Sequence, residues 1–269
     1  MYKKYLSVLA LALIAAACVS PEPFQSRFQT ALDGAHRQSG HAERDRFRHP
    51  TATLTFMGIE PRMNVVEISP GGGWYTDILA SYLDGALYAA HANPSDARPY
   101  VVRQLQSFSA QSAAHPAIYA GVTLAIFDPN NKRLDVPKES VDAVLTFRNV
   151  HNWVGSNSHT AAFELFYDIL VPGGILGVVE HRGAAGMSPE AMHESGYMSQ
   201  EQVIEIAGSA GFVLAASSEI NANPLDTANH PRGVWSLPPT LALGATDRQR
   251  YLEIGESDRM TLRFFKPER

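Results

Sequence analysis

Groups of polar side chains follow directly after two apolar stretches of the sequence. One group, 148–152, comes after the apolar stretch 140–147, and the other, 180–182, lies at the end of the apolar stretch 175–181. Because histidine, carboxylate and amide groups can move a proton or orient a substrate, such groups are candidates for acid–base chemistry. The candidate catalytic residues are Asn149, His151, Glu180 and His181.

The same residues also have simpler interpretations. Glu180 and Arg182 could form ion pairs at the surface, and His151 could cap a helix. The imidazole and carboxylate groups that commonly bind zinc or iron are also present, in His151, Glu180, His181 and His193. No closely spaced ligand pair such as His-Glu-x-x-His occurs. We therefore predict no metal site, and a metal-assisted hydrolase remains the third of three functional alternatives.

A glycine-rich stretch is the second candidate site. In "VVEISPGGGWYTDILA", residues 65–80, an apolar stretch runs through three glycines into a helix-like stretch. Gly71 and Gly73 allow positive φ and a close approach of a ligand to the backbone. The free N–H groups of the following helix would point at an anionic part of that ligand. The candidate ligand-binding residues of this stretch are Glu67, Ser69, Gly71, Gly72 and Gly73.

Strand-like and helix-like stretches alternate along the chain and would position both candidate sites. The predicted strands are 63–68, 86–91, 121–127, 140–147, 175–181, 212–220 and 259–267. The predicted helices are 76–83, 100–111, 159–170 and 199–211, with two more between 23 and 56. Nearly continuous apolar strands separated by helices predict an α/β fold with a parallel sheet covered on both faces. A sharp turn is expected at 172–174, and a loop-rich cap over one sheet edge at 221–258.

The motif Glu67-x-Ser69-x-Gly71-x-Gly73 resembles the first motif of the class I S-adenosylmethionine-dependent methyltransferases, usually Asp/Glu-x-Gly-x-Gly-x-Gly. Further stretches resemble that family in the same order, so that the resemblance covers 45–269. These stretches are "FDP" (127–129), "VDAVLTFRNVHNW" (141–153), "LVPGGILGVVEHR" (170–182) and "RMTLRFFKP" (259–267). Shorter stretches, among them "PGGGWYT" and "GESDRM", are similar to a little-characterised group of exported predicted methyltransferases.

This resemblance implies a Rossmann-like, mostly parallel sheet of seven strands with helices on both faces and an antiparallel last strand. It also implies S-adenosylmethionine as cofactor and a small-molecule methyl acceptor. Asp128 stands where the family has an acidic residue near the adenine. The family usually holds the ribose hydroxyls with a carboxylate after the second strand, but His91 and Asn93 stand there, with Asp96 a little beyond. Asn93 could hydrogen-bond a hydroxyl without adding charge.

Composition and charge argue against a nucleic-acid partner. The 269 residues are 45% hydrophobic and 18% charged, as in ordinary globular proteins, and the formal net charge is −5. No dense run of lysine and arginine is present. The electrostatic attraction that drives nucleic-acid binding is therefore missing.

The N-terminal residues have the pattern of an export signal. Lys3 and Lys4 precede the apolar run 6–14, and three alanines lead to Cys18, the single cysteine of the chain. This pattern predicts a signal of the lipoprotein type at 1–18, and a plain secretory signal is the alternative. We expect a tether and N-terminal helix at 19–44 and a methyltransferase-like domain at 45–269. The protein would then be exported and held at a membrane only through a lipidated Cys18.

Export would take the protein away from the cytoplasm, where S-adenosylmethionine is made. The second functional alternative is therefore a non-catalytic or repurposed domain of the same fold that binds another small ligand.

Overall fold

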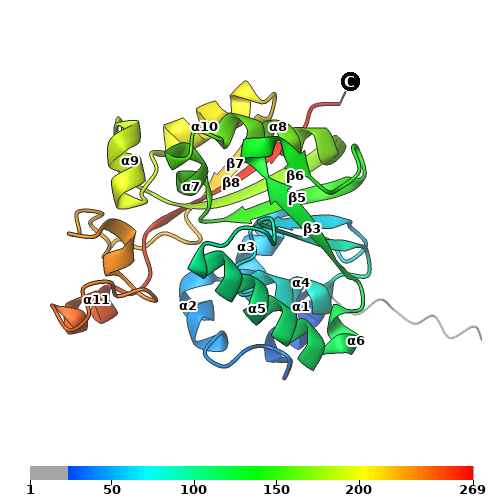
Figure 1. Ribbon diagram of the computed structural model, residues 1–269, viewed down its shortest axis with the longest axis horizontal. Coiled ribbons are helices and arrows are strands. Elements are labelled where there is room, and N and C mark those ends of the chain that lie inside the picture. Colours follow the sequence, from blue (N-terminus) through cyan, green and yellow to red (C-terminus); the bar gives the residue numbers. More distant parts are fainter. Residues whose placement is uncertain (1–23, 269) are drawn as a thin grey trace, which may run out of the picture.

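One β-sheet of eight strands runs through residues 24–268, the part of the chain that the computed structural model describes (Figure 1). The strand order is β4-β3-β2-β1-β5-β6-β8-β7. The strands are β1 (Val65–Ile68), β2 (Leu87–His91), β3 (Val122–Asp128), β4 (Arg133–Leu134), β5 (Val141–Phe147), β6 (Leu170–His181), β7 (Val213–Ser218) and β8 (Arg259–Phe265). Strands β1, β2, β3, β5 and β6 pair in parallel.

The last strand, β8, is antiparallel to both of its neighbours, β6 and β7. This arrangement confirms the predicted Rossmann-like fold with an antiparallel last strand. The eighth strand is the two-residue β4, which pairs antiparallel with the end of β3. It lies within a stretch whose turn-forming residues indicated only a loop.

Helices cover both faces of the sheet, as Figure 1 shows. On one face lie α1 (Phe24–Asp33), α3 (Pro50–Met57), α4 (Trp74–Tyr82), α5 (Pro99–Ala114) and α6 (Pro116–Tyr119). On the other face lie α7 (Val150–Gly155), α8 (His159–Ile169), α9 (Pro189–Ser195) and α10 (Gln200–Ser209). The sequence predicted two helices between residues 23 and 56. The structure has four there, because the short helices η1 (Ala42–Arg44) and α2 (Asp45–Arg48) lie between α1 and α3.

The alternation of side chains along β1 explains how one short strand serves two cores. Val66 and Ile68 pack in the core beneath α8 and α10, and Val65 packs in the core beneath α1, α3 and α4. Since successive side chains of a strand point to opposite faces, Glu67 lies on the same face as Val65. The only charged residue of β1 is thereby directed toward α4.

Strand β6 begins earlier than the sequence indicated. Its first residue is Leu170, so the expected sharp turn at 172–174 lies inside the strand, at an irregularity in its pairing with β5. Gly173 has a φ of 79°, and its N–H donates to the carbonyl of Lys266 over 2.8 Å. The prediction of a turn ahead of the strand was wrong because Gly173 and Gly174 exchange backbone hydrogen bonds with Lys266, the residue after β8, and these bonds keep the segment in the sheet.

The segment 221–258 consists of loops together with two short helices, η3 (Gly233–Ser236) and α11 (Arg248–Ile254). The predicted signal and the lipidated Cys18 lie outside the described residues. Between residues 24 and 268, no helix is long and apolar enough to cross a membrane.

We expect that a chain ending after Ser257 does not fold. Such a chain lacks β8, whose Met260, Leu262 and Phe264 are fully buried. Burying three large apolar side chains is worth about 5–9 kcal/mol, comparable with the whole stability of a domain. Circular dichroism should show no cooperative thermal transition for this chain, whereas a chain ending after Lys266 should melt like the full-length protein. An unchanged melting temperature after removal of β8 would contradict the prediction.

Candidate functional site

Two cavities meet at the carboxyl ends of the parallel strands, where α/β proteins commonly bind ligands. The first pocket has a volume of about 660 Å³ and the second a volume of about 690 Å³. Both are lined by Ser69 after β1 and by Asn149 after β5. The Nδ2 of Asn149 donates to the carbonyl of Ile68 over 3.1 Å and so ties the ends of the two strands together.

The glycine-rich turn after β1 adopts the left-handed backbone that its sequence predicts. Gly71 has a φ of 64° and Gly73 a φ of 90°, and Ser69, which stands where a glycine is usual, has a φ of 51°. A Cβ on Gly71 would meet only Gln104, at 3.7 Å, and one on Gly72 would meet only Ser107, at 3.6 Å. Gly71 and Gly72 line the second pocket, so their backbone is open to a ligand. Gly73 is buried, lines neither pocket, and begins α4.

Glu67 lies at the inner end of this turn. It is 3% exposed, and its Oε2 accepts a hydrogen bond from Thr76 Oγ1 over 2.6 Å. Burial raises the pKa of Glu67 to about 8, although the bond from Thr76 opposes the shift. Glu67 therefore holds a proton near neutral pH and could release it when a cationic group binds close by.

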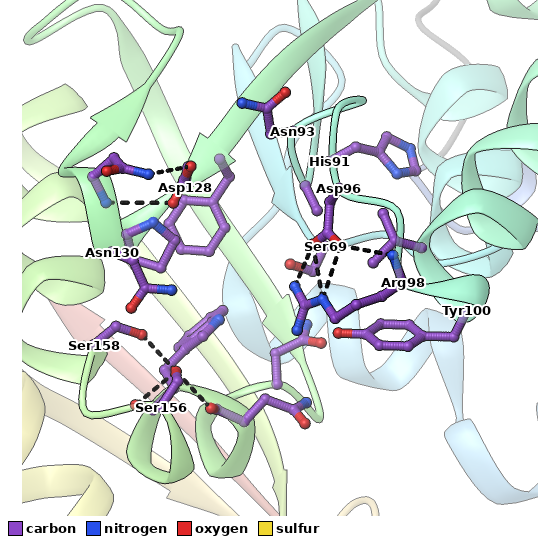
Figure 2. A pocket seen from close by; sticks show the side chains of 18 of the residues that line it. Ser69, His91, Asn93, Asp96, Arg98, Tyr100, Asp128, Asn130, Ser156 and Ser158 are labelled. Atoms are coloured by element: carbon purple, nitrogen blue, oxygen red, sulfur yellow. Dashed lines mark hydrogen bonds and ion pairs between the residues drawn. The ribbon is translucent and has the colours of Figure 1, made fainter.

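The first pocket lies at the ends of β2 and β3 (Figure 2). Asn93 and Asp128, the two ligand-binding candidates outside the glycine turn, both line it. The Oδ1 of Asn93 accepts bonds from Ser95, and Asp128 accepts a 2.8 Å bond from Asn131 Nδ2. The Nδ2 of Asn93 remains available as a donor for a hydroxyl.

A carboxylate group nevertheless lies near the end of β2. Asp96 lines the first pocket, and Arg98 holds its carboxylate through bonds of 2.8 and 2.5 Å. Figure 2 shows this pair across the pocket from Asp128. His91 is buried at the same end, and burial lowers its pKa to about 4. Asp96 is therefore the carboxylate nearest to the end of β2 that lines the first pocket.

The second pocket contains three of the four catalytic candidates, Asn149, His151 and His181. His151 and His181 line it, and their ring centroids are 5.5 Å apart. Burial lowers the pKa of His181 well below its ordinary value, and the charges of His151 and Arg148 add to this effect. His181 Nδ1 lies 2.5 Å from Ser257 Oγ. A neutral imidazole is thus held in place in the pocket.

Glu180 lines neither pocket and is fully buried. Its Oε2 accepts a 2.6 Å bond from the N–H of Val150 at the start of α7, and its Oε1 lies 3.2 Å from His151 Nδ1. The same Oε1 accepts the N–H of His181 over 2.7 Å. Glu180 is therefore placed to hold the His151 ring and the backbone of His181 rather than to touch a ligand.

The trio of His151, Glu180 and His181 has ligand atoms within 4.8 Å of one another, close enough to hold a metal ion. Both oxygens of Glu180 already accept backbone N–H groups. A metal ion bound by Glu180 would compete with these bonds at the start of α7. The geometry favours hydrogen bonding over metal binding at this trio.

A buried cluster of charges in the wall of the second pocket was not predicted from the sequence. The cluster consists of Arg44, Arg48, Arg259 and Glu256. Arg44 donates to Glu256 over 2.6 Å, although the two residues are 212 positions apart in the chain. Trp235, from the segment 221–258, lines the same pocket, so this segment closes a pocket as well as flanking the sheet. The stretches "ERDRFRHP" and "GESDRM", rich in charges beside apolar residues, were the available signal.

No family model matches the chain, and no curated protein matches it. Solved structures match by fold. The [4+2]-cyclase SpnF has a TM-score of 0.58 at 17% identity, with 88% of this chain and 86% of that chain covered. A SAM-dependent methyltransferase from Aquifex aeolicus has a TM-score of 0.55 at 15% identity, with 90% and 97% covered. Geranyl diphosphate methyltransferase in complex with SAM has a TM-score of 0.56 at 12% identity, with 88% and 94% covered.

These similarities define the fold, which is that of the class I S-adenosylmethionine-dependent methyltransferases. The sheet order and the position of the two pockets agree with it.

We expect Glu67 to make the stability of the protein fall as pH rises. Its pKa is about 8 in the folded protein against 4.5 for the ordinary group, so between these values the folded state binds one more proton than the unfolded state. The free energy of unfolding should then fall by about 1.4 kcal/mol per pH unit through this group.

Urea unfolding at pH 5.5 and pH 7.5 measures this effect. Between the two pH values, the wild type should lose about 2–3 kcal/mol more than the Glu67→Gln variant, which keeps an acceptor for Thr76. Glu43→Gln, at an exposed carboxyl group of η1, serves as the control and should follow the wild type. Equal pH dependence in the wild type and Glu67→Gln would show that Glu67 is already ionised in the folded protein.

Proposed function

We propose that the protein is an S-adenosylmethionine-dependent methyltransferase that acts on a small-molecule acceptor. The observation that carries this proposal is the meeting of two pockets at Ser69 and Asn149 on a methyltransferase fold. One pocket offers polar groups for a nucleoside, and the other holds histidines where an acceptor could bind. A methyl group placed at the junction would face both.

The residues of the first pocket and the glycine turn fit such a cofactor. Asn93 and Asp96 offer a donor and a carboxylate for ribose hydroxyls, and Asp128 offers a carboxylate near the adenine. The open backbone at Gly71 leaves room for the methionine part. Glu67, which holds a proton, would become charged as it meets the ammonium group of that part.

The bound cofactor supplies a methyl group on a positively charged sulfur. The site residues must then align an acceptor atom with it and exclude water. His181 is neutral because burial lowers its pKa, so its imidazole can accept the proton that an oxygen or nitrogen acceptor loses. Ser257 holds this imidazole through its contact with Nδ1, and Glu180 holds the ring of His151 beside it.

A second candidate function is a non-catalytic or repurposed domain that binds another small ligand. Two observations favour it. The end of β2 carries His91 and Asn93 in place of a carboxylate, and one of the solved structures of similar fold is, by its name, a [4+2]-cyclase. A fold shared by different reactions does not by itself fix the chemistry.

Binding of S-adenosylhomocysteine, the demethylated product, tests the proposal by calorimetry. Gly71→Val should weaken binding at least tenfold, because a branched side chain resists a φ of 64° and narrows the approach to the turn. Circular dichroism should show that the variant is still folded.

Gly121→Val is the matched control, since Gly121 lies outside both pockets and a Cβ there would meet nothing within 4 Å. It should bind like the wild type. If folded wild-type protein shows no binding at millimolar ligand, the methyltransferase proposal fails and the repurposed domain takes its place.

We further propose that the protein belongs with the exported methyltransferase-like group and is anchored to a membrane through Cys18. The support is the charged start, the apolar run and the three alanines before the cysteine. A diacylated and N-acylated cysteine would anchor the chain stably, whereas one acyl chain would bind only weakly.

Detergent-phase partitioning of the expressed protein checks the anchor. The wild type should enter the detergent phase, and Cys18→Ser should remain in the aqueous phase because it has no site for the lipid. Recovery of both proteins from the aqueous phase would refute lipidation while leaving the methyltransferase proposal untouched.

A further inference from the structure

We infer that the second pocket binds a methyl acceptor through an anionic group, a carboxylate or a phosphate, held by Arg148 together with Arg48 and Arg259. This inference rests on the proposed function, because it names the class of acceptor for the same site.

The charges that line the second pocket do not balance. Four guanidinium groups line it, those of Arg44, Arg48, Arg148 and Arg259. Its only carboxyl groups among the described residues are Glu67 and Glu256. The Glu256 carboxylate accepts bonds of 2.6, 3.2 and 2.5 Å from Arg44, Arg48 and Arg259. Glu67 holds a proton near neutral pH and is then uncharged. The four guanidinium cations of the pocket therefore share one anion, the Glu256 carboxylate.

Several guanidinium nitrogens have no hydrogen-bond partner among the described residues. Arg48 is 2% exposed, and its Nη2 is buried without a hydrogen bond. The Nη2 of Arg44 is buried without a partner as well. Arg148 is half-buried, its backbone N–H donates to the carbonyl of Val179, and its side chain makes no hydrogen bond or ion pair with the described residues 24–268. Burial and the charge of Arg259 lower the pKa of Arg148 to about 10. Buried charges are normally paired, so this arrangement indicates that the protein has left a place for an anion.

The cofactor does not supply the missing charge. S-adenosylmethionine carries a sulfonium and an ammonium group against a single carboxylate. Its binding would therefore add positive charge to the junction between the pockets. A second anion, which belongs to the acceptor, is needed to balance the arginines.

The backbone of Arg148 supports a role in binding. Arg148 directly follows β5 and has a φ of 64°, a left-handed conformation that is unfavourable for a side chain of this type. The side chain of Arg148 has no partner in the described part of the protein, so no side-chain contact seen in the fold offsets that strain. A ligand contact would account for it, because strained residues gather at binding sites.

Inorganic phosphate is the probe for this site. The wild type, Arg148→Gln and Arg103→Gln would be titrated with phosphate by calorimetry, and their melting temperatures measured with phosphate or with chloride at equal ionic strength. Arg103 is the control because it is exposed on α5 and lines neither pocket. Each titration would be repeated with saturating S-adenosylhomocysteine.

We expect phosphate to raise the melting temperature of the wild type and of Arg103→Gln more than chloride does. In Arg148→Gln, phosphate affinity should fall at least tenfold, and the melting temperature without phosphate should rise, because an unpaired cation has been removed. S-adenosylhomocysteine should bind all three proteins within threefold of one another and should leave the phosphate site open.

Equal phosphate binding by all three proteins would overturn the inference, as would a lower melting temperature of Arg148→Gln without phosphate. Loss of the phosphate effect in the presence of S-adenosylhomocysteine would also overturn it, because the arginines would then hold the cofactor carboxylate. If phosphate binds at Arg148 but S-adenosylhomocysteine binds none of the proteins, the proposed function fails while the anion site stands. If S-adenosylhomocysteine binds and phosphate does not, the acceptor inference alone fails.

Discussion

The buried carboxylate of Glu256 holds together three parts of the chain that form one wall of the second pocket. It accepts bonds from Arg44 in η1, Arg48 in α2 and Arg259 at the start of β8. Burial alone would raise the pKa of Glu256, but the surrounding arginines hold it well below its ordinary value. The carboxylate therefore stays ionised, and loss of its charge would leave the guanidinium groups buried against one another.

The second constraint lies at the ends of β1 and β5, the central pair of parallel strands. Each of these strands is followed by a non-glycine residue in the left-handed region, Ser69 after β1 and Arg148 after β5. Such residues are uncommon, and two of them at adjacent strand ends mark the junction of the two pockets as a place of stored strain. Asn149 bridges the same ends through its bond to the carbonyl of Ile68.

The fold and the site answer different questions about this protein. The fold is shared with methyltransferases and with a cyclase, so it defines where a ligand binds and leaves the reaction open. The chemistry that we propose depends on particular side chains, above all His181 and Arg148 in the second pocket. A proton acceptor and a surplus of positive charge in one pocket suit an anionic acceptor that loses a proton on methylation.

The sequence by itself determined the alternation of the seven longer strands with helices, the left-handed glycine turn after β1 and the antiparallel strand β8. These features depend on side-chain periodicity and on the φ angles that glycine allows, which are local properties of the chain. Only the tertiary structure decided that β6 begins at Leu170, that Glu67 is buried with a raised pKa, and that Glu180 orients His151 instead of lining a pocket. It also decided which charges meet: Arg44 and Glu256 are 212 positions apart, and no local pattern relates them. Burial and charge pairing are set by which segments pack together, and neighbours in sequence do not specify that.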